Sequence, residues 1–123
     1  MVKLALLHPQ EVEAHYILPA IRAHIAQAMK TDGREQKSIA GLLGVSEPAV
    51  SQYLSRERGD EVKFTPRVQR AVSIAARNVQ TREDFIAETQ RLLKLMLKER
   101  ITCRVHERVA NVPKGCDVCF RNE

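Results

Sequence analysis

The stretch QKSIAGLLGVSEPAVSQYLS, from Gln36 to Ser55, decides the fold of this 123-residue chain. Apolar residues recur at three- and four-residue spacing on both sides of Gly44, which predicts two short amphipathic helices joined by a tight turn. A glycine suits that turn because the backbone needs a positive φ angle there. Ser46 and Pro48 are typical of a helix cap and of a first-turn residue. Two helices joined in this way are expected to cross at a sharp angle.

Such a pair of helices is the helix-turn-helix of many DNA-binding proteins, in which the second helix enters the major groove. A glutamine there can hydrogen-bond the edge of adenine, and an alanine can contact the methyl group of thymine. The candidates for contacts to bases are Glu47, Ala49, Ser51, Gln52 and Ser55. The candidates for contacts to phosphate are Gln36, Lys37, Arg56, Arg58, Lys63 and Arg67. An ordinary helical hairpin with a solvated surface is the alternative.

Three further segments predict helices, and none predicts a strand. An apolar pattern over residues 10–30 gives one helix, which Pro19 is expected to kink or restart. Thr65 and Pro66 are a typical cap and first residue of a helix that reaches about Val79. Thr81 opens the last helix, FIAETQRLLKLMLKER, with a capping box. Aromatic residues make up only 4% of the chain, which also favours helix over sheet, so we expect an all-α fold.

The segments LPAIRAHIAQAMK and QKSIAGLLGVSEPAVSQYLS together resemble the Xre-type, or lambda-repressor-like, transcriptional regulators. More narrowly, they resemble a family of small regulators of archaea and bacteria that carry LPAIRA ahead of the helix-turn-helix and cysteines at the end. The resemblance covers most of the chain. It implies an all-helical, operator-binding protein that is usually dimeric.

The last predicted helix has an apolar surface wider than the single stripe of most surface helices. One face is formed by Phe85, Thr89, Leu92 and Met96, and the adjacent face by Ile86, Leu93 and Leu97. Core packing accounts for such a surface, and so does a helix shared between two subunits. We favour a homodimer, because a helix-turn-helix protein needs two copies to span two half-sites.

All three cysteines lie in CRVHERVANVPKGCDVCF, from Cys103 to Phe120. Two chelating pairs are present in it, Cys103-x-x-His106 and Cys116-x-x-Cys119. A two-residue gap lets both side chains of a pair reach one metal ion. Three thiolates and an imidazole close a tetrahedral Zn²⁺ site, and they also suit an iron–sulfur cluster. Three incidental thiols are the remaining alternative.

The choice between iron–sulfur and zinc stays open, with a slight preference for an iron–sulfur cluster. So short a chain shows no ligand pocket, so a regulated repressor is expected to take its signal at this tail. No secretory signal is visible in MVKLALLHPQ, and no apolar stretch approaches the roughly 18 residues that span a bilayer. We therefore expect a cytoplasmic protein with reduced thiols and no membrane partner.

The chain is thus expected to comprise a helix-turn-helix DNA-binding domain (residues 1–80), a dimerisation helix (81–102) and a metal-binding tail (103–123). The predicted function is sequence-specific binding of double-stranded DNA under redox or metal control, which the net charge of +5 suits, and not enzyme activity. Three alternatives remain: a regulator with a purely structural zinc site, a CxxC thiol redox protein, and an adaptor or antitoxin-like protein. The lack of a βαβ pattern argues against the redox protein.

Overall fold

The computed structural model describes residues 8–55, 62–110, 112 and 115–121, and these residues form helices with no strand. The prediction of an all-α fold is confirmed. The helices are α1 (Pro9–Val12), α2 (Leu18–Thr31), α3 (Gln36–Leu43), α4 (Glu47–Ser55), α5 (Pro66–Asn78), α6 (Arg82–Lys98) and α7 (Ile101–Val109). A π-helical turn, η1 (Glu13–Ile17), joins α1 to α2, and a 3-10 turn, η2 (Val118–Phe120), lies near the C-terminus.

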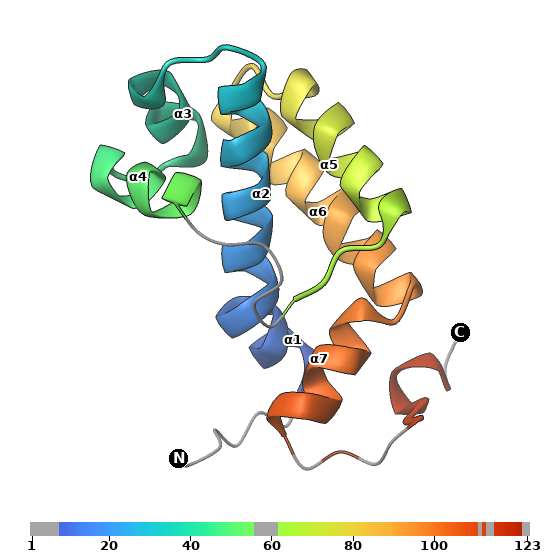
Figure 1. Ribbon diagram of the computed structural model, residues 1–123. Helices are drawn as coiled ribbons and strands as arrows, with labels where there is room; N and C mark the ends of the chain where they lie inside the picture. Colours follow the sequence, from blue (N-terminus) through green and yellow to red (C-terminus); the bar gives the residue numbers. More distant parts are fainter. Residues whose placement is uncertain (1–7, 56–61, 111, 113–114, 122–123) are drawn as a thin grey trace.

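Helix α2 runs through the middle of the molecule and is in contact with α3, α4, α5 and α6 (Figure 1). The α3–α4 pair lies on one side of it, and α5 and α6 lie on the other. Helix α7 packs against α1 and the end of α6, at the opposite end of the bundle from the turn between α2 and α3.

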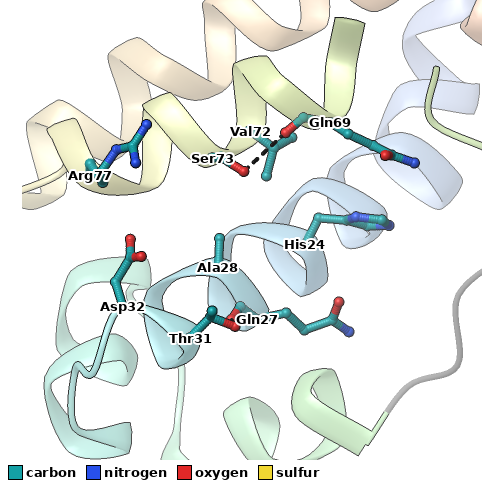
Figure 2. Close-up of a pocket in the computed structure, with 9 residues that line it drawn as sticks. All are labelled: His24, Gln27, Ala28, Thr31, Asp32, Gln69, Val72, Ser73 and Arg77. Carbon is teal, nitrogen blue, oxygen red and sulfur yellow. Dashed lines mark hydrogen bonds between the residues drawn. The ribbon is translucent and has the colours of Figure 1, made fainter. Parts of the chain in front are cut away.

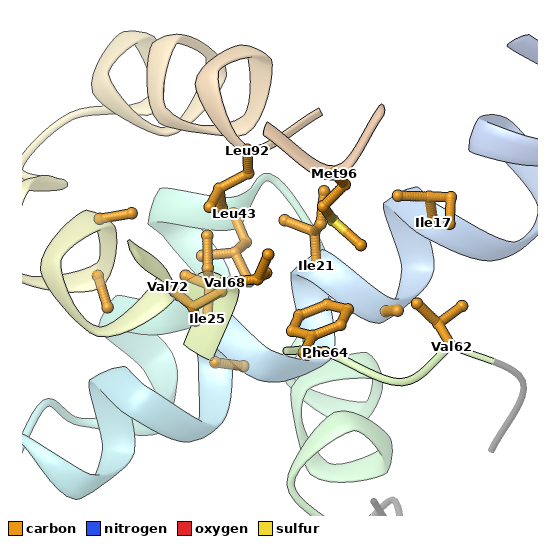
Figure 3. Close-up of a cluster of buried hydrophobic side chains, with 14 of the residues drawn as sticks. Ile17, Ile21, Ile25, Leu43, Val62, Phe64, Val68, Val72, Leu92 and Met96 are labelled. Carbon is orange, nitrogen blue, oxygen red and sulfur yellow. The ribbon is translucent and has the colours of Figure 1, made fainter. Parts of the chain in front are cut away.

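The centre of the core is the apolar stripe of η1 and α2. Ile17, Ile21, Ile25 and Met29 recur at four-residue spacing, and all of them are fully buried. Figure 3 shows how the other elements close around this stripe, with Leu43 from α3, Val68 and Val72 from α5, and Leu92 and Met96 from α6. Aliphatic side chains thus fill nearly the whole interior, as the low aromatic content requires.

Pro19 disturbs the first helix in the way the sequence predicts. The turn that precedes it is π-helical, and the N–H of Leu18 donates to the carbonyl of Glu13, five residues earlier. A proline ring collides with the carbonyl four residues before it in a regular α-helix. The wider turn relieves that collision, and Pro19 then occupies the first turn of α2, where its missing N–H costs nothing.

Both predicted threonine caps are present. The hydroxyl of Thr65 accepts a hydrogen bond from the N–H of Val68 at 3.3 Å and begins α5. The hydroxyl of Thr81 accepts from the N–H of Asp84 at 3.0 Å, and the carboxylate of Asp84 accepts in return from the N–H of Thr81 at 3.1 Å. This capping box fixes the start of α6.

Helix α7 was not expected from the sequence. Helix α6 ends at Lys98, and Arg100 adopts a left-handed conformation, with φ 61°, that redirects the chain. Ile101, Thr102 and Val105 are then buried, which gives α7 an inward face. Cys103 and His106, which the sequence places in a tail, therefore lie on a helix.

Candidate nucleic-acid interface and cysteine cluster

The turn between α3 and α4 has the geometry that its residues predict. Gly44 ends α3 in a left-handed conformation, with φ 68°, and its N–H donates to the carbonyl of Ala40. A Cβ atom at Gly44 would meet no other atom within 4 Å, so the glycine is required by backbone conformation and not by space. The hydroxyl of Ser46 accepts a hydrogen bond from the N–H of Ala49 at 3.2 Å and thereby caps α4.

Both helices of the pair turn their apolar sides inward. Ile39, Ala40 and Leu43 of α3 are buried, and so is Val50 of α4. Tyr53 is half-buried against the same core, and its backbone carbonyl accepts a hydrogen bond from the carboxamide of Gln27 on α2 at 2.9 Å. Helix α4 is thus held both by apolar packing and by a polar bond to the central helix.

The outward side of α4 carries the residues predicted to contact bases. Four of these are exposed, namely Glu47, Ser51, Gln52 and Ser55, and the fifth, Ala49, is half-buried. Among the residues predicted to contact phosphate, Lys37, Lys63 and Arg67 are exposed and Gln36 is half-buried. The candidates Arg56 and Arg58 lie outside the described residues.

Gln36 joins the two helices across this surface. Its carboxamide nitrogen donates one hydrogen bond to the hydroxyl of Ser51 and a second, of 3.3 Å, to the backbone carbonyl of Glu47. The first residue of α3 is therefore fixed against the middle of α4. A polar surface whose side chains are held in this way is preorganised for recognition, because fewer rotamers are lost on binding.

The cysteines come together at the other end of the molecule. Cys103 lies in the first turn of α7 and is half-buried, as is Cys116, whereas Cys119 is exposed. Burial raises the pKa of the Cys103 thiol, and negative charge on the nearby Cys119 and Cys116 raises it further, against the opposing charge of Arg100. The three sulfur atoms are therefore within electrostatic reach of one another.

Two contacts hold the C-terminal segment against α7. The N–H of Gly115 donates to the carboxylate of Glu107 at 2.9 Å. The guanidinium group of Arg100 lies 4.2 Å from the centre of the Phe120 ring, in a cation–π contact. Because Arg100 precedes α7 and Phe120 follows Cys119, this contact brings the two ends of the cysteine-containing region together.

The predicted metal ligands are of types that bind zinc or iron, but their side chains are not arranged around a common point. His106 is buried one turn beyond Cys103 on α7. In the part of the chain that the structure describes, no three His, Cys, Asp or Glu side chains are grouped closely enough to hold a metal ion. Three thiols and an imidazole are nevertheless the donor types that zinc and iron–sulfur clusters take.

The sequence did not indicate a polar contact that joins the start of α5 to the end of α6. Glu99, at the end of α6, accepts a hydrogen bond from the hydroxyl of Thr65 at 2.8 Å, and its other carboxylate oxygen lies 3.4 Å from Nε of Arg67. The contact links the start of α5 to the junction of α6 and α7. No spacing rule relates residues 34 positions apart, so nothing in the sequence indicated it.

Within the described residues, every helix is too short or too polar to cross a membrane. Searches against protein-family models, curated proteins and solved structures found no match to this chain.

Proposed function

We propose that the protein is a sequence-specific, DNA-binding transcriptional regulator in which the α3–α4 pair is a helix-turn-helix. The observation that carries the proposal is the combination of a left-handed Gly44 between two helices with buried apolar sides and a row of exposed polar residues on α4. An ordinary solvated hairpin has the first two features and also exposes polar residues, so the proposal depends on the types of residue exposed: Ser51 and Gln52 can hydrogen-bond the edges of bases. The net charge of +5 suits an anionic duplex.

In this proposal α4 lies in the major groove. Gln52 is exposed in the middle of the helix and reads a base edge, with adenine as its best partner. Gln36 and Ser51 are bonded to each other, so they approach the duplex as one unit, with Gln36 facing the phosphate backbone. Lys37 and Lys63 are exposed and add phosphate contacts that strengthen binding without selecting a sequence.

The protein binds as a homodimer in this proposal, and the packing of α6 narrows the choice of interface. Leu92 and Met96 are buried in the chain's own core, so that face of α6 is already used. The adjacent face retains apolar surface, because Ile86 is 60% exposed and Leu93 and Leu97 are half-buried. We assign the dimer contact to this second face.

The cysteine cluster is the sensing site in this proposal. Cys103, Cys116 and Cys119, with His106, would hold an iron–sulfur cluster or, as the alternative, zinc. A cluster supplies reversible electron transfer, and zinc supplies structural cross-linking. The Arg100 and Glu99 contacts then connect the site to α5, which follows the recognition helix along the chain.

The direct test is selection of duplexes from a random pool by the intact, anaerobically purified protein. We expect a two-fold symmetric consensus whose half-sites are about one helical turn apart, as the docking of a helix-turn-helix dimer requires. Affinity should fall steeply with added salt. Recovery of random sequences, or of no DNA, would contradict the proposal and favour the adaptor alternative.

A further inference from the structure

A polar hollow of about 300 Å³ lies between α2 and α5, away from the cysteine cluster (Figure 2). The sequence patterns did not indicate a hollow at this place. The hollow forms because the facing residues in this part of the two helices are small or polar, so the helices do not close fully over it. Its volume is at the lower end of the range for small-molecule sites in proteins.

One end of the hollow carries two opposite charges. Asp32 caps the C-terminus of α2, and Arg77 lies in the last turn of α5. Figure 2 shows the carboxylate and the guanidinium group at the same end of the hollow, on opposite walls. Among the described residues, neither side chain takes part in a hydrogen bond or an ion pair with another group.

The remainder of the hollow changes from apolar to polar along its length. Ala28 of α2 and Val72 of α5 line its middle. At the other end, the imidazole of His24 stacks on the ring of Phe64 at 4.0 Å, and the carboxamide nitrogen of Gln69 donates to the Phe64 carbonyl at 3.2 Å. Both polar side chains are thus held in place by the same residue, which makes this end rigid before any ligand arrives.

This distribution of charge selects one class of ligand. A simple anion would be attracted by Arg77 but repelled by Asp32. A simple cation would be attracted by Asp32 but repelled by Arg77. A molecule with a carboxylate and an ammonium group on neighbouring atoms satisfies both charges at once. A polar side chain on that molecule would pass Ala28 and Val72 and reach the hydrogen-bonding end.

We propose that the hollow binds a free α-amino acid with a polar side chain. Its carboxylate pairs with Arg77, its ammonium group pairs with Asp32, and its side chain extends toward His24 and Gln69. The volume of the hollow accommodates such a molecule together with a few water molecules. The proposal rests neither on the metal chemistry of the tail nor on DNA binding.

Isothermal titration calorimetry of the intact protein without DNA tests the assignment with each of the twenty amino acids. We expect a polar amino acid to bind, and its N-acetyl and methyl ester derivatives, which each lack one charge, to bind at least roughly tenfold more weakly. Asp32→Asn and Arg77→Gln should each weaken binding by a similar factor. Both residues are exposed, so these variants should fold normally.

Arg70→Gln is the matched control, because Arg70 is exposed on α5 but does not line the hollow, and this variant should bind the amino acid normally. Ser73→Trp should abolish binding by filling the space while leaving both charges in place. Absence of binding by all twenty amino acids at millimolar concentration would overturn the proposal. So would equal binding of the parent amino acid and its N-acetyl derivative, or unchanged affinity in both charge variants.

Discussion

The hydroxyl group of Thr65 donates a 2.8 Å hydrogen bond to the carboxylate of Glu99, across 34 positions of the chain. The same hydroxyl accepts from the N–H of Val68, so one oxygen atom both caps α5 and holds the end of α6. Glu99 is well shielded from water, with 18% of its side chain exposed. The bond therefore fixes the junction of α6 and α7 to the start of α5.

Thr65→Val should destabilise the protein by about 1–3 kcal/mol, because the cap is lost and a shielded carboxylate loses its donor. Thr65→Ser keeps the hydroxyl and should cost less than about 1 kcal/mol. Urea unfolding followed by circular dichroism measures both. Equal losses in the two variants would show that the methyl group, and not the hydrogen bond, matters at this position.

Gln52→Ala should weaken binding to the selected duplex by about 1–3 kcal/mol and leave binding to random duplexes nearly unchanged. The reason is that an exposed glutamine in the middle of α4 reads a base edge and carries no net charge. Fluorescence anisotropy at fixed salt concentration gives both affinities. Gln90→Ala is the matched control, an exposed glutamine on α6, and should change neither. Equal losses on both duplexes in the Gln52 variant would argue against direct base readout.

Light scattering of the intact protein at micromolar concentration should report about twice the 13.9 kDa of one chain. Ile86→Lys should lower the measured mass to that of one chain, because the substitution places a charge in the assigned interface. Ile86 is 60% exposed, so the monomer itself should keep its stability. Ile74→Lys, at a residue that is 52% exposed on α5, is the matched control and should remain dimeric. If Ile74→Lys gave a monomer and Ile86→Lys did not, the dimer interface would be on α5 and the assignment to α6 would be wrong.

Anaerobically purified protein should be brown and should bleach in air with a change in operator affinity, if an iron–sulfur cluster is bound. Each of Cys103→Ser, Cys116→Ser and Cys119→Ser should remove the metal, whereas His106→Ala should only weaken its binding or shift the potential. His15→Ala, at an exposed histidine of η1, is the control. Metal analysis and absorption spectra decide the outcome. One zinc per colourless chain would make the site structural, and neither metal in stoichiometric amount would refute the metal centre.

Acid should weaken the start of α6. The N–H groups of Gln80 and Thr81 and the Thr81 hydroxyl bond the Asp84 carboxylate and lower its pKa, with the Gln80 bond as the largest cause. A carboxyl group with a lowered pKa stabilises the folded state above its ordinary pKa, and this contribution is lost as the pH falls through the lowered value. Asp84→Asn should therefore be less stable at neutral pH and lose less on acidification. The free energy of unfolding, measured by urea denaturation between pH 7 and pH 2, checks both expectations. Glu83→Gln, in the same helical turn, is the control and should keep the pH dependence of the unchanged protein.

The helix boundaries near the turn could be predicted because their signals are local. A glycine with positive φ, a serine cap and two threonine caps each act within one helical turn, so α3 ends, and α4, α5 and α6 begin, where the sequence indicates. Helix α7 was missed for a physical reason. Ile101, Val105 and Val109 have helical spacing, but the bend before them depends on a left-handed arginine, a residue type that gives no turn signal.

The candidate sites likewise comprise features that local sequence predicts and features that depend on contacts between distant segments. The exposed residues of α4 follow from helical periodicity alone, and the structure leaves four of the five exposed. The Gln36–Ser51 bond and the hollow between α2 and α5 depend on how separate helices cross. On each helix alone, Asp32 and Arg77 look like ordinary solvated charges, so sequence patterns cannot show that they face one space.

The left-handed conformation of Arg100 has a consequence for the order in which the protein folds. A residue with a side chain pays roughly 1–2 kcal/mol in this conformation, and a cation–π contact returns on the order of 0.5–1 kcal/mol. That contact comes from Phe120, which emerges from the ribosome after α7 is complete. Within the described residues, Ile101, Val105 and Ala110 belong to the buried core, and Val112 packs against it, so these contacts can place α7 before Phe120 is available. The cation–π contact that stabilises the left-handed turn is therefore among the last features of the molecule to form during synthesis.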